Sequence, residues 1–353
     1  LCILAQNKDI DKKFYPFAWD IAKNVGKFLS LKDEKIICLN RSSPGYKGIF
    51  KPKKGHFYQL FFRKDEDDDR NKKTFKKNNL IKNKSQKKSI KLTDSLIDSW
   101  FILKPQRRNK TEILHPAKYP EDLVNLFVNK FSLKNDFVFD PMSGTGSTQI
   151  AALKAGRNAI GTELSSFFCN IAQERCNELV NPTQKSLFET DQINNSFKLI
   201  KVDARKINKK DFKKIDYVIT SPPYWDMLNM IGAENQAKRI DQGLQTNYSE
   251  DKEDYGNIED YDLFINELKD IYIKISKLMT PGSFMTIVVK NIKKKGRNYP
   301  FAWDLSNELI PHMTLCNETF WCQDDISIAP FGYGNTWVSN TFHQYCLTFQ
   351  VRD

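Results

Sequence analysis

The chain has 353 residues, of which 40% are apolar and 12% aromatic, enough for a folded core of one or two domains. Its 55 Lys and Arg exceed its 43 Asp and Glu, and the formal charge of +12 suits a polyanionic partner without identifying one. The seven cysteines include no C-x-x-C pair, which argues against a disulfide framework or a zinc site. The sequence has no apolar run near the ~18 residues of a membrane helix and no signal-peptide pattern, which argues against a membrane or secreted protein. We therefore predict a cytoplasmic protein.

The first 65 residues repeat the C-terminal end of the chain. The hexapeptide YPFAWD occurs at residues 15–20 and again at 299–304, within a longer collinear match. We therefore expect residues 1–65 to be a partial copy of the C-terminal strand, helix and hairpin of a domain whose front half is not in this chain. The matched pairs include Asn7 with Asn291, Leu31 with Leu315, Glu34 with Glu318, Cys38 with Cys322 and, after a short slip, His56 with His343.

Both copies of the repeat end in an alternating apolar pattern. At residues 56–62 and 343–349, apolar or aromatic residues occupy every second position, which predicts a half-buried strand in each copy. His343 begins the second of these strands and has a counterpart in the copy without catalytic motifs. We therefore interpret it as a structural histidine rather than an acid or base.

Residues 66–95 separate the partial repeat from the rest of the chain. They contain the lysine-rich run KKTFKKNNLIKNKSQKKSIK without apolar periodicity, which is typical of a flexible linker. A basic arm that contacts phosphates is the alternative interpretation. The boundaries predict a complete domain over residues 96–353.

Short apolar segments alternate with helical patterns through this domain. The clearest helix is predicted over residues 261–279 and ends before Pro281 and Gly282. The alternation predicts an α/β fold with a mostly parallel sheet covered on both faces, and with ligands at the carboxyl ends of the strands. The predicted strands are 137–139, 158–162, 197–202, 216–220 and 284–290.

A glycine-containing turn follows the first of these strands in the sequence FVFDPMSGTGST, residues 137–148. Asp140 ends the strand, and Gly144 and Gly146 allow the backbone to approach a ligand closely before a helix begins at Ser147. This pattern predicts a nucleoside-binding turn, although a purely structural turn remains the alternative for a glycine pair taken alone. No Walker-type lysine follows, so a triphosphate is not indicated.

Two further carboxylates end the next two strands. Glu163 can accept hydrogen bonds from two ribose hydroxyls, and Asp203 from an adenine amine. Each acid taken alone is more often a surface residue or a helix cap. Together with Asp140, however, they form an ordered series at the edge where ligands bind.

The segment TSPPYW, residues 220–225, follows a predicted buried strand. Two prolines fix a narrow extended turn, so the carbonyls of Ser221 and Pro222 remain available to accept hydrogen bonds from an amine. Tyr224 offers a ring on which a base can stack. The alternative is an ordinary turn with aromatic packing.

These motifs resemble those of the amino-methyltransferases of DNA. The likeness covers residues 96–353 and includes HPAKYPEDL at 115–123. It implies a Rossmann-like methyltransferase sheet with an antiparallel C-terminal hairpin strand, S-adenosylmethionine as cofactor and double-stranded DNA as substrate, and it leaves a cognate restriction endonuclease open as a partner. The implied cofactor residues are Lys118, Asp140, Pro141, Ser143, Gly144, Gly146, Glu163, Asp203 and Thr220; the implied catalytic residues are Ser221, Pro222, Pro223 and Tyr224; no metal is implied.

The resemblance implies direct transfer to an amine of an extruded base. Hydrogen bonds from the amine to Ser221 Oγ and the Pro222 carbonyl would favour a nucleophilic nitrogen. Ser at the first motif position resembles the cytosine-N4 branch, which makes N4 of cytosine the leading target and N6 of adenine its nearest rival. An RNA amino-methyltransferase and a catalytically inactive DNA-binding relic are further alternatives.

Two features depart from the family pattern. The cofactor motif precedes the catalytic motif, whereas the common cytosine-N4 order is the reverse. We interpret this as a permutation by duplication, in which residues 1–65 close one copy, 96–203 are shared and 216–353 close another. No target-recognition segment is obvious, so the polar insertion at 226–260 is the candidate, with a surface loop as the alternative. The lysines of 290–297 could contact phosphates or form a solvated run.

Overall fold

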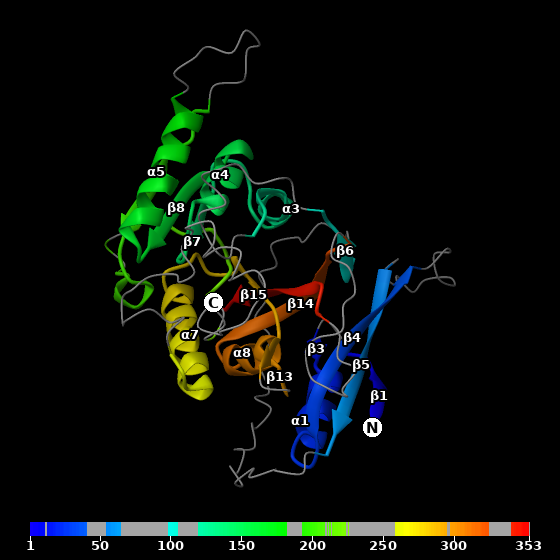
Figure 1. The fold of residues 1–353 in the computed structure, drawn as a ribbon. Coiled ribbons are helices and arrows are strands. Elements are labelled where there is room, and N and C mark those ends of the chain that lie inside the picture. The colour runs from blue at the N-terminus through cyan, green and yellow to red at the C-terminus, as the bar shows by residue number, and fades with distance from the viewer. Residues whose placement is uncertain are drawn as a thin grey trace, which may run out of the picture. The chain divides into compact units, whose positions relative to one another are not determined.

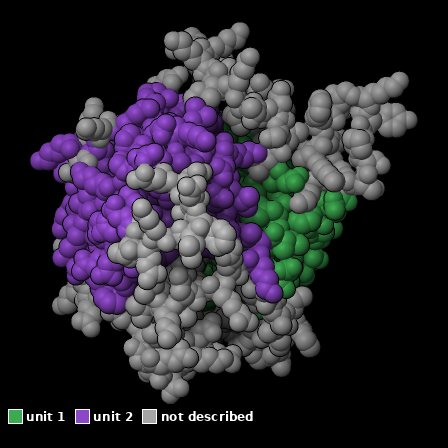
Figure 2. Space-filling model, turned by 90° about the horizontal axis from the view of Figure 1, so that it is seen from above, with its two compact units in different colours: residues 1–102, 290–303, 316–345 green, residues 103–289, 304–315, 346–353 purple. Residues whose placement is uncertain are grey.

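The fold was obtained as a computed structural model. The structure describes residues 1–10, 13–40, 54–64, 98–104, 119–181, 193–208, 210, 212, 214–223, 225, 258–294, 297–324 and 340–352. They form two compact units, shown in two colours in Figure 2. Unit 1 comprises residues 1–102, 290–303 and 316–345, and unit 2 comprises residues 103–289, 304–315 and 346–353.

A doubly wound parallel sheet forms the core of unit 2 (Figure 1). Its strands lie in the order β9-β8-β7-β10-β11, and every neighbouring pair is parallel. The order reverses between β7 and β10, so the carboxyl ends of these two strands flank the topological switch point, where open α/β sheets bind ligands. The bounds are β7 Phe137–Asp140, β8 Asn158–Glu163, β9 Phe197–Lys201, β10 Tyr217–Thr220 and β11 Phe284–Val289, which confirms the predicted strands to within a few residues.

Helices connect these strands, as the predicted alternation requires. The clearest predicted helix is confirmed as α7, Tyr261–Ser276, whose Asp260 side chain accepts a hydrogen bond from Leu263 N at 2.8 Å as an N-cap. Among the described residues, no helix is both long and apolar enough to cross a membrane. Further helices of unit 2 that the structure describes are α3 Glu121–Phe131, α4 Ser147–Lys154, α5 Ser166–Val180 and the short η1 Ala204–Lys206.

The C-terminal strands extend the sheet in the order β11-β15-β14-β6. Strand β15, His343–Val351, runs antiparallel to β11, because Val351 N donates to Ser283 O at 2.9 Å and Thr286 Oγ1 lies 3.0 Å from Thr348 Oγ1. The predicted antiparallel hairpin strand is therefore confirmed. The prediction that this strand is half-buried is wrong, because β15 lies inside the sheet and nearly all of its residues are buried on both faces. The outer strands are β14 Met313–Cys322 and β6 Trp100–Ile102, which pair in parallel.

The partial repeat folds into the same elements as the C-terminal module. A short hairpin, a helix and two longer strands follow one another in both copies (Figure 1). In the first copy, residues of strand β5 alternate between buried and partly exposed positions, as predicted. The first copy consists of β2 Lys8–Ile10, β3 Lys13–Tyr15, α1 Phe17–Val25, β4 Ser30–Asn40 and β5 Lys54–Arg63, with β1 Cys2–Ala5 added at its edge; the second consists of β12 Ile292–Lys294, β13 Arg297–Tyr299, α8 Phe301–Leu309, β14 and β15.

Two lysines of the basic segment at 290–297 make hydrogen bonds inside unit 1. Lys290 Nζ donates to the Thr341 carbonyl at 2.6 Å, and Lys293 forms an ion pair with the buried Asp33. Burial and the nearby Lys293 ammonium lower the pKa of Lys290 to about 8. These two side chains are therefore neither a solvated run nor presented to phosphates, in contrast to both interpretations of the sequence.

The lowered pKa of Lys290 predicts how stability depends on pH. Between about pH 8 and the ordinary lysine value of 10.5, the unfolded chain binds more protons at this residue than the folded chain. The free energy of unfolding should therefore gain a contribution that rises with pH in this window, by at most about 1.4 kcal/mol per pH unit. Urea unfolding at several pH values measures it. A Lys290→Met variant should lose the contribution, and an unchanged slope in that variant would contradict the assignment.

Candidate functional site

Asp140 ends β7 with a fully buried carboxyl group. Its Oδ1 accepts hydrogen bonds from Thr220 Oγ1 at 2.7 Å and from Met142 N at 3.0 Å. Its Oδ2 accepts from Tyr119 OH at 2.9 Å and from Thr148 Oγ1 at 2.6 Å. Burial raises the pKa of Asp140, and these four hydrogen bonds oppose that rise. The residue therefore joins surrounding segments rather than facing a ligand.

Four segments of unit 2 meet at this carboxylate. Thr220 is the last residue of β10, Thr148 lies in the first turn of α4, and Met142 belongs to the glycine-containing turn. Tyr119 lies in the segment before α3, and its hydroxyl also lies 3.4 Å from the Ile219 carbonyl. The structure thus brings the predicted cofactor turn and the predicted catalytic turn together through one buried group. Sequence reasoning did not single out Tyr119 or Thr148.

The two glycines of the turn adopt left-handed conformations. Gly144 has φ 51° and Gly146 has φ 84°, values that side chains beyond glycine rarely adopt. A Cβ on Gly146 would lie 3.0 Å from the Ala172 Cβ of α5, so this glycine also lets two helices approach closely. Both glycines are buried, and no side chain covers the backbone of the turn at these two positions.

Glu163, at the end of β8, accepts a hydrogen bond from the backbone of the glycine-containing turn. Its Oε2 accepts from Gly144 N at 2.8 Å and its Oε1 from Ser165 N at 2.9 Å. The side chain is half-buried. These two bonds orient the carboxylate at the carboxyl end of β8.

Beneath the turn, Gly161 of β8 leaves room for two polar side chains. Gln149 Nε2 donates to Ser143 Oγ at 3.1 Å and to the Ile160 carbonyl at 2.9 Å. A Cβ on Gly161 would lie 2.3 Å from Ser143 Oγ and 2.5 Å from Gln149 Nε2. The turn therefore requires glycine at 161, a requirement that nothing in the local sequence pattern indicated.

Asp203 has a protein partner at the position predicted to bind an amine. Its carboxylate accepts from the Arg205 backbone N at 2.8 Å and from the guanidinium, with Nη2 to Oδ2 at 2.7 Å. The residue also begins the short helix η1 as its N-cap. The predicted contact between Asp203 and an adenine amine stays a prediction. Arg205 binds the same carboxylate.

The predicted catalytic turn follows the buried strand β10. Ser221 and Pro223 are half-buried and Pro222 is buried. Beyond it, the buried Trp225 donates from Nε1 to the Glu259 carbonyl at 3.1 Å, and its ring lies 5.0 Å from that of Tyr261 at the start of α7. The turn is thus fixed at both ends. Tyr224, Lys118 and most of the predicted insertion, residues 226–257, lie outside the described residues.

The donors and acceptors at the switch point suit an uncharged nucleoside group. Glu163 places a carboxylate at the end of β8, and the two left-handed glycines leave the turn without side chains at their positions. The turn from 137 to 148 contains no Lys or Arg to neutralise a phosphate. Within the described ranges, no group of three or more His, Cys, Asp and Glu side chains is arranged to hold a metal ion. The predicted cofactor turn therefore fits a nucleoside better than a nucleotide.

Known proteins are similar in sequence to parts of this chain. The family model N6_N4_Mtase, DNA methylase, matches residues 4–174. The type II methyltransferase M.MthZI of Methanothermobacter thermautotrophicus is 35% identical over 97 residues, which are 28% of this chain and 27% of that protein. The orphan methyltransferase M.BamHII of Bacillus amyloliquefaciens is 42% identical over 67 residues, 19% of this chain and 25% of that protein.

The chain thus matches only about a quarter of the length of these curated relatives. Among solved structures, magnesium protoporphyrin IX methyltransferase from Synechocystis PCC 6803 has a TM-score of 0.38 at 14% identity, over 66% of this chain and 81% of that one. A likeness this weak adds nothing to the strand order described above.

Removing the Tyr119 hydroxyl should destabilise the fold more than removing a buried tyrosine hydroxyl elsewhere. Tyr119→Phe deletes a hydrogen bond to a carboxylate, which contributes about 1.5–3 kcal/mol, whereas a bond between neutral groups contributes about 0.5–1.5 kcal/mol. Tyr217→Phe is the matched control, because its buried hydroxyl donates to Thr286 Oγ1 at 2.8 Å. Urea unfolding of both variants measures the difference, and an equal loss would contradict the central role of Asp140.

Adding a methyl group at Gly161 should destabilise the cofactor turn. The overlaps with Ser143 Oγ and Gln149 Nε2 predict a loss of about 1–3 kcal/mol in the free energy of unfolding of Gly161→Ala. Ser143→Ala removes the nearest overlapping atom, so the double variant should lose less than the sum of the two single losses. Strictly additive losses in thermal or urea unfolding would argue against this steric explanation.

Proposed function

We propose that the chain is a DNA amino-methyltransferase, of the family whose model matches residues 4–174, and that it methylates the exocyclic N4 of cytosine in DNA with S-adenosylmethionine as cofactor. The observation that carries the proposal is the hydrogen bond from Thr220 Oγ1 to Asp140 Oδ1 at 2.7 Å. It connects the last residue before the catalytic turn to the last residue before the cofactor turn. A methyl donor and an acceptor base held by these turns would be neighbours.

S-adenosylmethionine, when bound, supplies an activated methyl group on a sulfonium. We assign its ribose to Glu163 and its adenosine to the backbone of Gly144 and Gly146. Asp140 and Thr220 act as positioning residues, since their side chains bond to each other inside the protein. Pro141 and Ser143 shape the turn between them. Lys118 and Asp203 are assigned to the cofactor only by their motif positions.

The target amine belongs to Ser221 and Pro222. An exocyclic amine has two N–H donors, and Ser221 Oγ and the Pro222 carbonyl can each accept one. Accepting both would hold the nitrogen in place and favour the geometry in which its lone pair is available. Pro223 keeps the turn extended, and Tyr224 would stack on the base, which must leave the duplex to reach this turn.

Ser221 favours cytosine over adenine in this proposal. Ser at the first position of the motif is the tendency of the cytosine-N4 branch, whereas Asp or Asn is usual in adenine-N6 enzymes. Adenine N6 therefore remains the alternative target. Nothing in the geometry of the described residues favours RNA over DNA as the substrate. The experiment below distinguishes the two.

The family match supports a shared cofactor half. It begins at residue 4, inside the partial repeat, and ends at residue 174, inside α5. The family order therefore accommodates the repeat and the cofactor turn as parts of one domain. This supports the hypothesis that residues 1–65 and 96–203 belong to one copy in the common order, and that residues 216–353 close a second copy around the same cofactor half.

Two variants separate cofactor binding from catalysis. Ser221→Ala should lower the methylation rate about 10²–10³-fold, the loss typical of one donor or acceptor used in the transition state, and leave cofactor affinity unchanged. Glu163→Gln should weaken cofactor affinity about 10–100-fold, because it replaces a charged acceptor. The assay uses labelled S-adenosylmethionine with mixed-sequence duplex DNA, nucleoside digestion and mass spectrometry, and calorimetry for affinity.

Labelled N4-methylcytosine that disappears in Ser221→Ala is the expected result. Labelled N6-methyladenine would show that the target base is adenine rather than cytosine. Label in RNA but not in DNA would overturn the DNA substrate, and failure of the wild-type chain to bind S-adenosylmethionine would favour a DNA-binding relic and overturn enzymatic activity.

A further inference from the structure

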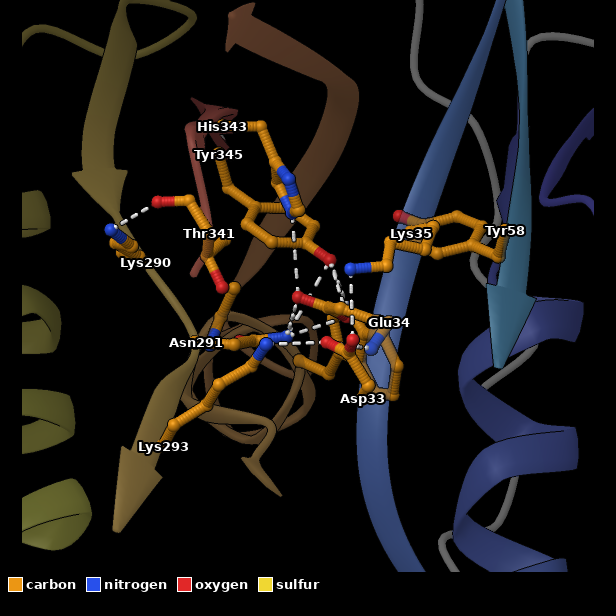
Figure 3. A network of polar contacts seen from close by, with 12 residues as sticks. Asp33, Glu34, Lys35, Tyr58, Lys290, Asn291, Lys293, Thr341, His343 and Tyr345 are labelled. Carbon is orange, nitrogen blue, oxygen red and sulfur yellow. Dashed lines mark hydrogen bonds and ion pairs between the residues drawn. The ribbon is translucent and has the colours of Figure 1, made fainter. Parts of the chain in front are cut away.

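The two copies of the repeat exchange equivalent hydrogen bonds within unit 1. Asn7 Nδ2 donates to Glu318 Oε1 at 2.9 Å, and its counterpart Asn291 donates to Glu34, the counterpart of Glu318, also at 2.9 Å. Figure 3 shows the half of this arrangement around Glu34. Each asparagine also caps the helix of its own copy, with Ala18 N to Asn7 Oδ1 and Ala302 N to Asn291 Oδ1, both at 2.8 Å. The exchange is therefore reciprocal.

Tyrosines and histidines of the last strand in each copy repeat the same exchange. Tyr58 OH donates to Glu318 Oε2 at 2.5 Å, and Tyr345 OH donates to Glu34 Oε2 at 3.0 Å. Each carboxylate thus accepts from one asparagine and one tyrosine of the opposite copy. The equivalent histidines lie beside them, with His56 Nε2 at 3.1 Å from Glu318 Oε1 and His343 Nε2 at 3.4 Å from Glu34 Oε1.

Two pairs of equivalent residues face each other directly. The rings of Trp19 and Trp303 stack with centroids 6.1 Å apart and an interplanar angle of 16°. The Sγ atoms of Cys38 and Cys322 are 4.0 Å apart. A residue meets its own counterpart only on the axis of a two-fold interface, while other residues make paired contacts on either side. The copies are therefore related by a local two-fold axis that passes between these two pairs.

Among the described residues, the side chains that donate to each buried carboxylate belong to the opposite copy. Glu34 and Glu318 are each only 2% exposed, and the asparagine, tyrosine and histidine beside each one come from the other copy. A buried carboxylate without such donors would cost several kcal/mol. The polar centre of each face is thus complete only when a second copy of the same face covers it.

We infer that this face of the C-terminal module is a self-recognition surface, built to pair with a second copy of itself about a two-fold axis and filled here within the chain by residues 1–63. We call it the two-fold face and define it by Asn291, Trp303, Glu318, Cys322 and Tyr345. The same physical logic makes isologous interfaces in homodimers. A chain whose first copy cannot bind should therefore pair through the two-fold face with another chain.

One asymmetric contact favours pairing within the chain. Lys293 of the C-terminal copy forms an ion pair with Asp33 of the first copy, and both side chains are largely buried. The counterpart of Asp33 in the C-terminal copy is Asn317. Two C-terminal faces would therefore place Lys293 opposite an uncharged amide and lose this ion pair. The covalent connection adds to the preference, because a tethered partner is present at an effective concentration of the order of mM.

A disulfide between the facing thiols of Cys38 and Cys322 would identify which two copies of the repeat are paired. Cys38 is exposed, so an oxidant can reach the pair, and the hydrogen bond with Cys322 lowers the pKa of Cys38. Diamide would take two electrons and two thiol protons, becoming the hydrazine, as the S–S bond forms. In the wild-type chain the expected product is a monomer with a Cys38–Cys322 disulfide, identified by peptide mass spectrometry. Cys2→Ser should form the same link, and Cys38→Ser should not.

Breaking the first copy should move the pairing between chains. Glu34→Arg with Cys38→Ser places a cation against Asn291 and the Tyr345 hydroxyl and leaves the two-fold face intact. The expected result is a doubled sedimentation mass and, with diamide, a dimer linked through Cys322 of both chains. Cys38→Ser alone is the matched control and should stay monomeric without that link.

Other outcomes would overturn the inference. A folded Glu34→Arg/Cys38→Ser chain that stays monomeric and forms no Cys322 link would show that the face does not recognise itself. A wild-type chain that yields no Cys38–Cys322 disulfide would contradict the two-fold arrangement itself. If the Arg variant does not fold, Asp33→Lys with Cys38→Ser is the second test: it should raise the dimer fraction, and adding Lys293→Asp should restore the monomer. A dimer fraction that does not respond would overturn the inference equally.

Discussion

The carboxyl group of Asp140 is removed from water and depends on four donors from four parts of unit 2. An ionised carboxylate in such a place is tolerated only when every donor is in position, because losing one leaves a buried acceptor short of a partner. The constraint fixes the end of β7 relative to the end of β10, through Thr220, and relative to the segment before α3, through Tyr119. The predicted cofactor turn and the predicted catalytic turn are adjacent for this reason.

The same constraint separates the roles of Asp140 and Glu163, two acidic residues at neighbouring strand ends. Asp140 bonds only to protein groups that the structure describes, whereas Glu163 is half-buried at the neighbouring strand end and orients toward the turn through Gly144 N. Asp140 therefore connects the segments of the candidate site, whereas Glu163 is the proposed contact for the cofactor. Both are acids at strand ends in the sequence, and only their burial separates the two roles.

The sequence predicted the central strands and the α7 helix because these depend on local patterns, apolar runs and a helix cap. The cofactor and catalytic roles of the two turns stay predictions. The sequence did not predict Tyr119, Gln149 or the need for glycine at 161, because those roles arise from packing between segments distant in the chain. Nor did it predict that Arg205 binds Asp203. The alternation of β15 indicated a half-buried strand, but nearly all of its residues are buried on both faces. A two-residue period does not encode which segments cover the second face of a sheet.

The repeat shows a similar limit. Matching residues along the chain established that a second copy of the C-terminal module exists, and the structure shows the same elements in both. Which residues of one copy contact the other did not follow from the match. The conserved spacing of Asn7 and Glu34, and of Asn291 and Glu318, has its physical reason in the reciprocal exchange of donors between copies. Internal repetition thus completes a polar interface as well as lengthening the chain.

The most direct test of this account is a crystal structure of the chain with S-adenosylhomocysteine, the demethylated cofactor. The account predicts the ligand at the switch point between β7 and β10, with its ribose hydroxyls on Glu163, its adenosine against Gly144 and Gly146, and its sulfur facing the turn at Ser221 and Pro222. Asp140 should keep its four hydrogen bonds unchanged. A ligand bound elsewhere, or an Asp140 carboxylate that turns to contact the ligand directly, would contradict it.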